Sequence, residues 1–423
     1  MRIFKKLSVW FGLLALAGLA ACASLPDHPQ SPSVVAATPE RAGTAVPLIL
    51  ISIDGFHPDY LTRGVTPNLN AIGQKGVSAA MRPSFPSVTF PNHYTLVTGL
   101  RPDHHGIVGN TMRDPQRPEQ RFALSNAEAV TDRFWWDDGV PFWVSAEQAG
   151  MKTGTMFWPG SEADIRGVRP SYYVKFNQKL PGNARVDQVL AWLDLPEAER
   201  PQATTLYFDI VDTAGHHHGP DSERVNEAVA SVDQSIGYLL EQLKARGLEG
   251  RVNIVVVSDH GMSPTSADRG VFLDELIPAD SYRFVTLGPV AMLNAVDGRD
   301  AEVAAGLLKD HEHMQCWRKG EVPERLHFGT HRRVPEFVCM AEARWLIAQN
   351  RTKGVGYTGG AHGYDPESPD MASSFIAAGP DIRQGVALEV FDNVDVYPFV
   401  MRLLKLQPEP NDGSLKLLEP ALR

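Results

Sequence analysis

The stretch Pro47-Leu48-Ile49-Leu50-Ile51-Ser52-Ile53-Asp54-Gly55 is a short, almost wholly apolar run that ends abruptly at an acidic residue and a glycine. A continuous run of this kind is typical of a strand that is buried on both faces, as in a parallel sheet. Runs of the same character follow at 204–210, 252–257 and 373–378. The sequence therefore predicts four strands of one central sheet.

A helix is predicted between the second and third of these runs. Apolar residues recur there every three or four positions, and Gly247 follows the last of them. Strand, helix and strand in this order predict an α/β fold, with a doubly wound, mostly parallel sheet and helices on both faces. The predicted apolar face of the helix consists of Val225, Val229, Val232, Ile236, Leu240 and Leu243.

The N-terminus has the pattern of a secretory signal. Three basic residues among the first six precede an apolar run over 7–19, which is too short to predict a membrane span. Leu19-Ala20-Ala21-Cys22 resembles a bacterial lipobox, which implies lipidation of Cys22; a plain cleaved signal is the alternative. Because Ala23 rather than an aspartate follows, we expect a lipid anchor in the outer membrane, on the periplasmic face of the envelope.

We therefore divide the chain into a signal peptide over 1–21, a lipid-anchored flexible tether over 22–46 and a folded domain over 47–423. The tether is rich in Pro, Ala and Ser and has no apolar period. Within the folded domain, a charge cluster at about 300–338 predicts an inserted subdomain or long loop region rather than another sheet layer.

The chain is acidic, with a formal charge of −10. Removal of residues 1–21 takes away Arg2, Lys5 and Lys6 and no acid, so the charge becomes −13. We expect no nucleic-acid-binding surface, and an anionic substrate must be held locally, for example by metal ions. After Cys22 only Cys316 and Cys339 remain, and they are expected either to pair in the oxidising periplasm or to stay as two buried thiols.

Acidic residues follow three of the predicted strands. Asp54, Asp212 and Asp259 lie at or just past the ends of apolar runs, where ligands bind in open α/β sheets. One such aspartate is usually a turn former or cap, but three in series indicate a site. Histidines that accompany them, His216 and His260, supply nitrogen ligands of the kind that zinc prefers.

Two further residues have a structural and a functional interpretation. His362, in a glycine-rich loop, is either a third histidine ligand or a structural histidine. Thr89 lies between Pro86 and Pro91 where a helix is predicted to begin, so it is either an N-cap or a nucleophile. The positive end of the helix dipole favours both an alkoxide and a bound phosphate there.

The ordered set of motifs resembles the nucleotide pyrophosphatase/phosphodiesterase family of the alkaline phosphatase superfamily, in a bacterial form with a single catalytic domain. Its motifs extend from residue 47 to about 380. They are Asp54-Gly55, the segment 83–99 around Thr89, 106–110, 212–220, 258–262 and His362-Gly363-Tyr364.

The resemblance implies a two-zinc hydrolase of nucleotide phosphodiester or pyrophosphate bonds. It would release nucleoside 5′-monophosphates through a threonyl-phosphate intermediate on Thr89. By the same resemblance, Asn110 and the Thr89 backbone N–H hold a phosphate oxygen, whereas Phe90 and Tyr207 stack on a nucleobase. The implied ligands are Asp212, His216 and His362 for one zinc ion, and Asp54, Asp259, His260 and the Thr89 oxygen for the other.

Other functions stay open at this point. A phosphomonoesterase commonly needs an extra cation, which Arg82 or Arg101 could supply by folding back. A phosphodiesterase of choline phospholipids and a metal-binding lipoprotein without catalysis are further alternatives. The residues specify neither the physiological substrate, nor the metal used in the cell, nor the oligomeric state.

Overall fold

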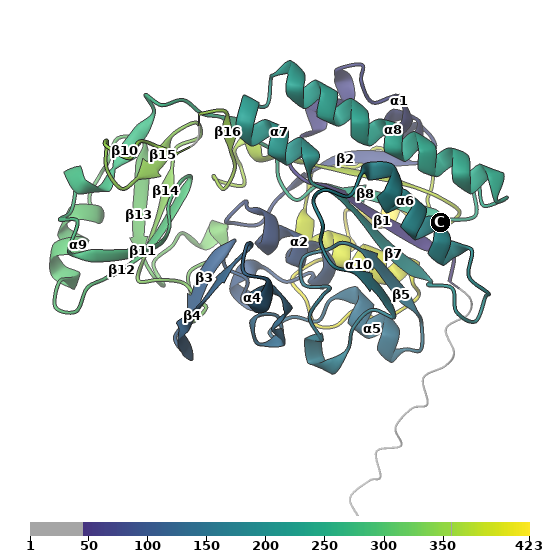
Figure 1. Ribbon diagram of the computed structural model, residues 1–423, viewed down its shortest axis with the longest axis horizontal. Coiled ribbons are helices and arrows are strands. Elements are labelled where there is room, and N and C mark those ends of the chain that lie inside the picture. Colours follow the sequence, from purple (N-terminus) through teal and green to yellow (C-terminus); the bar gives the residue numbers. More distant parts are fainter. Residues whose placement is uncertain (1–44, 357) are drawn as a thin grey trace, which may run out of the picture. The chain divides into compact units, whose positions relative to one another are not determined.

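The structure is a computed structural model that describes residues 45–356 and 358–423 (Figure 1). The predicted signal peptide, the predicted lipidation site Cys22 and all but the last two residues of the predicted tether lie outside the described residues. Among the helices that the structure describes, none is both long enough and apolar enough to cross a membrane.

An eight-stranded sheet forms the centre of the described chain, in the order β18-β2-β17-β8-β1-β7-β5-β6. Strand β1 (Leu48–Ile53) lies between β7 (Ala203–Phe208) and β8 (Asn253–Val257) and is parallel to both. Every residue of these three strands is buried, which explains why their sequences show no polar alternation. The remaining strands are β2 (Val77–Arg82), β5 (Thr153–Met156), β6 (Tyr172–Val174), β17 (Ser373–Ala378) and β18 (Phe391–Asp392).

The predicted α/β fold with a mostly parallel sheet is confirmed, although β17 is antiparallel to both of its neighbours. Leu48 and Leu50 of β1 point into one apolar core, and Ile49 and Ile51 point into a second core on the opposite face. Helices cover both cores, as Figure 1 shows. They are α2 (Thr89–Thr98), α5 (Phe142–Gln148) and α10 (Val396–Leu403) on the first face, and α1 (Pro67–Gln74), α6 (Gly182–Leu193) and α8 (Glu223–Ala245) on the second.

Helix α8 is the helix predicted between the second and third strands. The Ser222 side chain accepts a hydrogen bond from the Val225 N–H and caps its N-terminus. Beyond its C-terminus, Gly247 has a φ of 67°, a left-handed conformation that favours glycine. Of the predicted apolar face, only Leu240 is not fully buried, and Leu239 is buried beside it.

A second sheet lies in the segment 270–348, which we call the insert lobe. Its order is β11-β12-β14-β13, and all neighbours are antiparallel. The prediction that this region would not form another sheet layer is wrong, because β13 and β14 form a sheet with β12, which precedes residue 300 and pairs with β14. The division of the chain into domains itself stays a prediction. The elements of the lobe are β10 (Gly270–Phe272), β11 (Tyr282–Thr286), β12 (Val290–Ala295), α9 (Asp300–Leu307), β13 (Met314–Arg318), β14 (Phe337–Ala341) and β15 (Leu346–Ala348).

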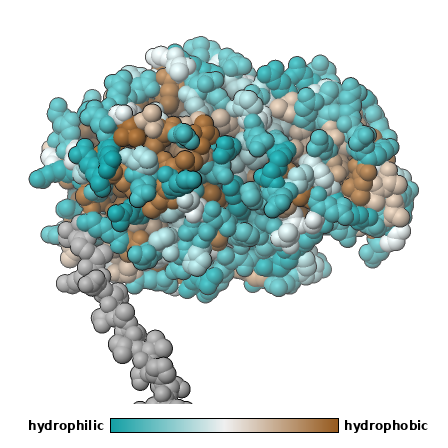
Figure 2. All heavy atoms as spheres, turned by 180° about the vertical axis from the view of Figure 1, so that it is seen from behind, coloured by the Kyte–Doolittle hydropathy of each residue, from teal (hydrophilic) through white to brown (hydrophobic). Residues whose placement is uncertain are grey.

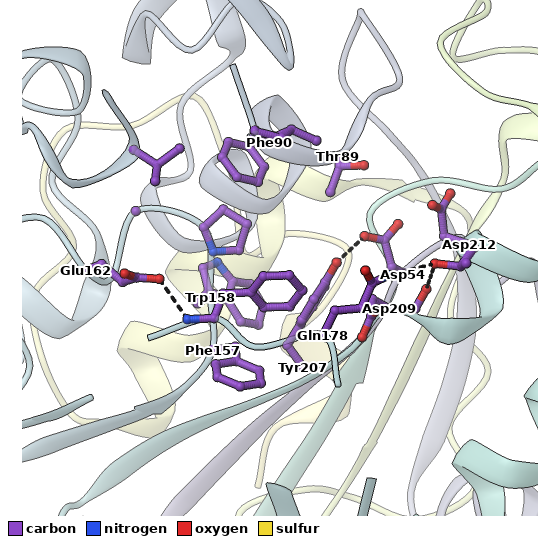
Figure 3. A pocket seen from close by; sticks show the side chains of 16 residues that line it. Asp54, Thr89, Phe90, Phe157, Trp158, Glu162, Gln178, Tyr207, Asp209 and Asp212 are labelled. Carbon is purple, nitrogen blue, oxygen red and sulfur yellow. Dashed lines mark hydrogen bonds between the residues drawn. The ribbon is translucent and has the colours of Figure 1, made fainter. Parts of the chain in front are cut away.

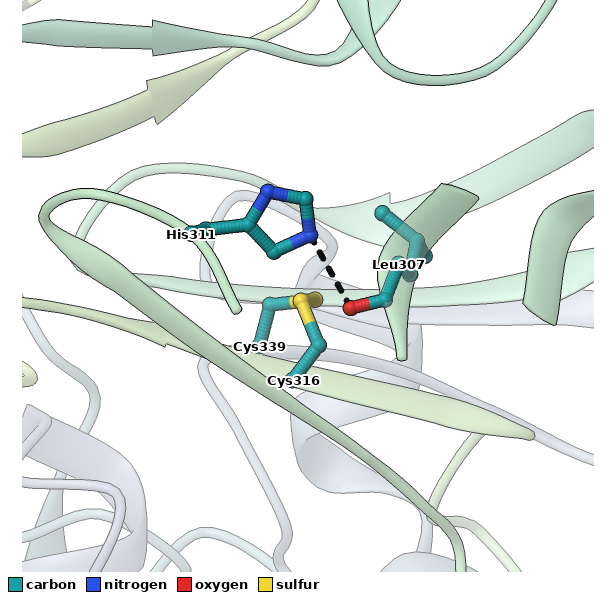
Figure 4. The surroundings of a disulfide bond; sticks show 4 residues. All are labelled: Leu307, His311, Cys316 and Cys339. Carbon is teal, nitrogen blue, oxygen red and sulfur yellow. Dashed lines mark hydrogen bonds between the residues drawn. A yellow bond between two sulfur atoms is a disulfide. The ribbon is translucent and has the colours of Figure 1, made fainter. Parts of the chain in front are cut away.

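A disulfide joins the edge strand β13 of this second sheet to its neighbour β14. Cys316 and Cys339 lie directly opposite each other on β13 and β14, and their sulfur atoms are bonded (Figure 4). Of the two alternatives for these cysteines, the structure therefore contains the pair.

Buried charges fix the insert lobe to a hairpin of the main domain, formed by β3 (Thr111–Asp114) and β4 (Arg117–Ala123). The buried Arg333 donates to the Asp114 carboxylate at 2.6 Å and to three backbone carbonyls. Asp103 accepts the backbone N–H groups of residues 329–331. Removing one partner of a buried ion pair costs about 3–5 kcal/mol, so these contacts hold lobe and hairpin in one arrangement.

The surface is predominantly hydrophilic on the face that Figure 2 shows, and apolar side chains gather in limited areas. Six large hydrophobic side chains are exposed among the described residues: Leu124, Tyr173, Phe176, Phe284, Leu308 and Val390. Two of them, Leu124 and Phe176, line a cavity beside Thr89.

Candidate functional site

The three strand-end aspartates converge at one edge of the central sheet. Asp54 directly follows β1, Asp259 follows β8, and Asp212 lies in the first turn of α7 (Ile210–His218) after β7. Gly55 has a φ of 68°, and a Cβ added to it would lie 3.1 Å from the Asp212 Cα. A side chain at position 55 would therefore push two of the carboxylates apart.

The first group of potential metal ligands consists of Asp54, Asp259 and His260, whose ligand atoms all lie within 4.8 Å of one another. The His260 Nε2 atom is 3.0 Å from Asp259 Oδ2 and 3.5 Å from Asp54 Oδ1. The Thr89 hydroxyl lies 3.4 Å from the same Nε2 atom. The structure thus places Thr89 beside this group, as the family resemblance implies.

The second group consists of Asp212, His216 and His362. Asp212 and His216 are one helical turn apart on α7, and His362 approaches from the glycine-rich loop that follows β16 (Gly360–Ala361). Each Nε2 atom lies 3.4 Å from Asp212 Oδ1, and the two Nε2 atoms are 3.1 Å apart. Three converging donors of this kind match a divalent cation such as zinc.

Backbone carbonyls orient all three histidines. The Nδ1 atoms of His216, His260 and His362 lie 2.8, 2.9 and 3.0 Å from the carbonyl oxygens of Gly360, Gly261 and Ser87. A carbonyl oxygen can only accept, so each Nδ1 carries a proton, and each Nε2 faces the site.

The carboxylates of both groups have oxygens that are buried and without a hydrogen bond from any described residue: Asp54 Oδ1, Asp212 Oδ1 and Asp259 Oδ2. Burial, together with the neighbouring carboxylates, raises the pKa of Asp54 well above its usual value, and burial also raises the pKa of Asp212. Burial would raise the pKa of Asp259 as well, but His260 and His93 hold it well below the usual range. The donor set thus favours bound cations over three bare buried carboxylates.

Thr89 is the first residue of α2, and Val88, with extended backbone angles, is the N-cap residue. The prediction that Thr89 itself occupies the N-cap position is wrong by one residue. No side-chain hydrogen bond caps this helix, so the Thr89 hydroxyl is not used for capping. Asn110 lies beside the helix N-terminus, where its Oδ1 accepts the Phe90 N–H at 2.8 Å.

Tyr207 lines cavity 1 and also contacts a candidate metal ligand, so its stacking on a nucleobase stays a prediction. It is only 8% exposed, and its hydroxyl donates to Asp54 Oδ2 at 2.6 Å (Figure 3). Phe176, which the sequence analysis missed, is 50% exposed, and its ring centroid lies 5.2 Å from that of Phe157 and 6.0 Å from that of Tyr207. An exposed aromatic side chain in a segment without clear periodicity gave no sequence signature.

His93 was also missed. It is fully buried one helical turn after Thr89, with Nε2 at 2.8 Å from the Ser52 hydroxyl and Nδ1 at 2.9 Å from the Thr89 carbonyl oxygen. The same Nδ1 atom is 3.3 Å from Asp259 Oδ2. His93 thus connects the start of α2 to a ligand of the first group, and its four-residue spacing from Thr89 was the available clue.

Thr89 lies between two cavities. Cavity 1 has a volume of about 240 Å³, and five of the sixteen residues that line it are aromatic (Figure 3), whereas cavity 2 has a volume of about 510 Å³ and opens toward the insert lobe. Thr89, Leu124 and Asp212 line both. Cavity 1 is defined here by Phe90, Phe157, Trp158, Phe176, Gln178 and Tyr207, and cavity 2 by Asn110, Arg121, His216, Leu287, Met292 and His362.

This fold and site define a class: α/β hydrolases of the alkaline phosphatase type, in which a hydroxyl lies beside candidate metal sites. The sequence matches the family described as type I phosphodiesterase / nucleotide pyrophosphatase over residues 48–365. The chain belongs to this family, whose members are hydrolases of phosphodiester bonds and generally depend on metal ions. The resemblance identified from the sequence motifs is thereby confirmed.

The chain is 37% identical to an uncharacterised pyrophosphatase/phosphodiesterase of Schizosaccharomyces pombe, across 89% of this chain and 80% of that protein. It is 38% identical to ectonucleotide pyrophosphatase/phosphodiesterase family member 3 of Bos taurus, across 87% of this chain but only 43% of that protein. The structure of human ectonucleotide pyrophosphatase/phosphodiesterase 5 matches with a TM-score of 0.85 and 33% identity, across 89% of this chain and all of that chain. An inactive variant of murine ectonucleotide pyrophosphatase/phosphodiesterase 5 has been solved in complex with AMP.

We predict that His362→Ala loses about one equivalent of zinc, because it removes one of three donors to the second group. Burial and the nearby His260 and His216 hold the pKa of His362 well below its usual value, so the imidazole is neutral and available to a metal. The measurement is zinc per chain by mass spectrometry after dialysis. His217→Ala is the matched control, because the exposed His217 belongs to neither group; unchanged zinc in His362→Ala would return His362 to a structural role.

Proposed function

We propose that the protein is a two-zinc phosphodiesterase and nucleotide pyrophosphatase that releases nucleoside 5′-monophosphates through a threonyl-phosphate intermediate. The observation that carries the proposal is the position of Thr89, which lies beside the first ligand group and lines two cavities. A phosphodiester has a substituent on each side of its phosphorus, and each cavity can receive one of them. The aromatic lining of cavity 1 suits a nucleobase, because stacking accepts any base.

In this proposal the Thr89 oxygen attacks phosphorus, an Oγ–P bond forms, and the bond from phosphorus to the leaving oxygen breaks. Zinc ions, when bound, would favour the deprotonated hydroxyl and neutralise charge on the phosphate. Asn110 and the backbone N–H groups at the start of α2 would hold a non-bridging oxygen. Water then cleaves the Oγ–P bond, so the nucleoside monophosphate leaves and the Thr89 hydroxyl is restored.

The contacts of two arginines argue against a phosphomonoesterase. Arg82 donates to Asp392 at 2.8 Å, and Arg101 donates to the same carboxylate at 2.7 Å. Neither lines a cavity beside Thr89. The extra cation that a phosphate monoester commonly requires is therefore not supplied by the two candidates named from the sequence.

Cavity 1 gives no separate support for choline phospholipids. Its two acidic side chains away from the candidate metal groups are already paired: Glu162 accepts the Phe176 N–H, and Asp209 forms an ion pair with Arg185 at 2.8 Å. A quaternary ammonium group and a nucleobase both bind to aromatic faces, so this lining does not favour choline over a nucleotide.

We predict that Thr89→Ala lowers the turnover of bis-p-nitrophenyl phosphate by at least about a thousandfold, because it removes the nucleophile. Zinc content should stay near normal, since two complete ligand groups remain. Thr89→Ser, which keeps a hydroxyl, is the matched control and should retain measurable turnover. Wild-type rates in Thr89→Ala would contradict the assignment of the nucleophile.

We also propose that the mature chain is anchored to the outer membrane, on the periplasmic side, through a lipid on Cys22. The support is the lipobox-like sequence together with the Cys316–Cys339 disulfide, since disulfides persist in oxidising compartments. We predict that Cys22→Ala moves the protein from the membrane fraction to the soluble periplasmic fraction and abolishes labelling by radioactive palmitate. A Cys22→Ala protein that still takes up label and stays with membranes would rule out this anchor.

A further inference from the structure

We infer that cavity 2 receives the leaving group and that Arg121 makes the site prefer a leaving group that begins with a second phosphate. This inference rests on the proposed function and deepens it. It assigns a residue outside both ligand groups to substrate specificity, and it favours pyrophosphate-linked nucleotides over diesters whose leaving group is an uncharged alcohol.

The position of Thr89 assigns the two cavities to the two substituents. In-line displacement places the leaving oxygen on the side of phosphorus opposite the attacking oxygen. Thr89 lies beside the first ligand group, whereas His216 and His362 of the second group line cavity 2 and not cavity 1. With a nucleoside in the aromatic cavity 1, the leaving group extends past the second group into cavity 2.

Arg121 is the only lysine or arginine among the described residues that line cavity 2. It lies on β4, and the next residue, Phe122, is buried in the core on the opposite face of the hairpin. Alternation along the strand therefore directs Arg121 toward the cavity. Its guanidinium makes no ion pair or hydrogen bond with the residues that the structure describes, so its donors are available to a ligand.

The wall of cavity 2 that the insert lobe forms has no charged side chain. The insert lobe contributes the apolar side chains of Leu287, Pro289, Val290 and Met292, which carry no charge. An acidic chain with a formal charge of −10 needs a local cation to hold a polyanionic leaving group. A guanidinium donates two parallel hydrogen bonds to a phosphate and suits this task.

Lobe and hairpin are already fixed relative to each other before any ligand binds. The buried Arg333 of the lobe binds Asp114 of β3 at 2.6 Å, and β3 pairs with β4 so that Arg113 lies opposite Arg121. The hairpin that carries Arg121 is thus held in place against the insert lobe, which forms the facing wall of cavity 2. Cavity 2 therefore needs no large rearrangement to bind a leaving group.

The test compares two substrates with the same nucleoside: thymidine triphosphate, which loses pyrophosphate, and the p-nitrophenyl ester of thymidine 5′-monophosphate, which loses p-nitrophenol. We expect Arg121→Gln to lower the ratio of their kcat/KM values by about tenfold, the size expected for a charge-assisted hydrogen bond in a solvated site. Arg113→Gln is the matched control, because Arg113 lies on the same strand pair but does not line cavity 2. It should leave the ratio unchanged.

Binding gives a second readout that does not depend on turnover. In the Thr89→Ala background, calorimetry should show that Arg121→Gln weakens α,β-methylene-ATP about tenfold relative to AMP, which lacks the leaving group. An unchanged kinetic ratio together with an unchanged relative affinity would overturn the role of Arg121. Failure of the wild-type protein to hydrolyse either substrate would instead overturn the proposed function, and the calorimetric comparison would then decide the role of Arg121 alone.

Discussion

The repulsion among three carboxylates, two of them buried and that of Asp212 half-buried, is the constraint on which the rest of the site depends. Asp54, Asp212 and Asp259 are held together because three parallel strands end at the same edge of the sheet. Burial of like charges is costly unless cations balance them. The surrounding residues meet this demand: Gly55 permits the close approach, and backbone carbonyls turn three imidazole Nε2 atoms inward. Stability of the fold and occupancy of the site are thus physically coupled.

Function arises where this charged edge meets elements from distant parts of the chain. Helix α2 presents Thr89 at its positive end, with His93 linking it to Asp259. The segment between β5 and β7 supplies most of the aromatic wall of cavity 1, and the insert lobe supplies the apolar wall of cavity 2. The sheet edge and the loop after β16 together bring the two candidate ligand groups into place, and Thr89 lines both cavities.

The central sheet and most of the candidate metal ligands could be predicted from the sequence. Strands buried on both faces appear as apolar runs, and the candidate ligands at strand ends follow those runs directly. Local patterns could not reveal what depends on long-range pairing. The second sheet joins strands on both sides of residue 300, and no local period marks it. The hydrogen bond from the Tyr207 hydroxyl to Asp54 likewise joins residues far apart in the sequence, and no local pattern marks it. Phe176 and Arg121 acquire their roles only when separate segments meet around Thr89.

The measurement that tests the account most directly compares bis-p-nitrophenyl phosphate with p-nitrophenyl phosphate as substrates of the protein, before and after chelation and zinc restoration. The account predicts a clear preference for the diester, lost on chelation and recovered with zinc, because two cavities flank one nucleophile between two cation sites. A preference for the monoester, or diester hydrolysis that survives complete removal of metal, would contradict it.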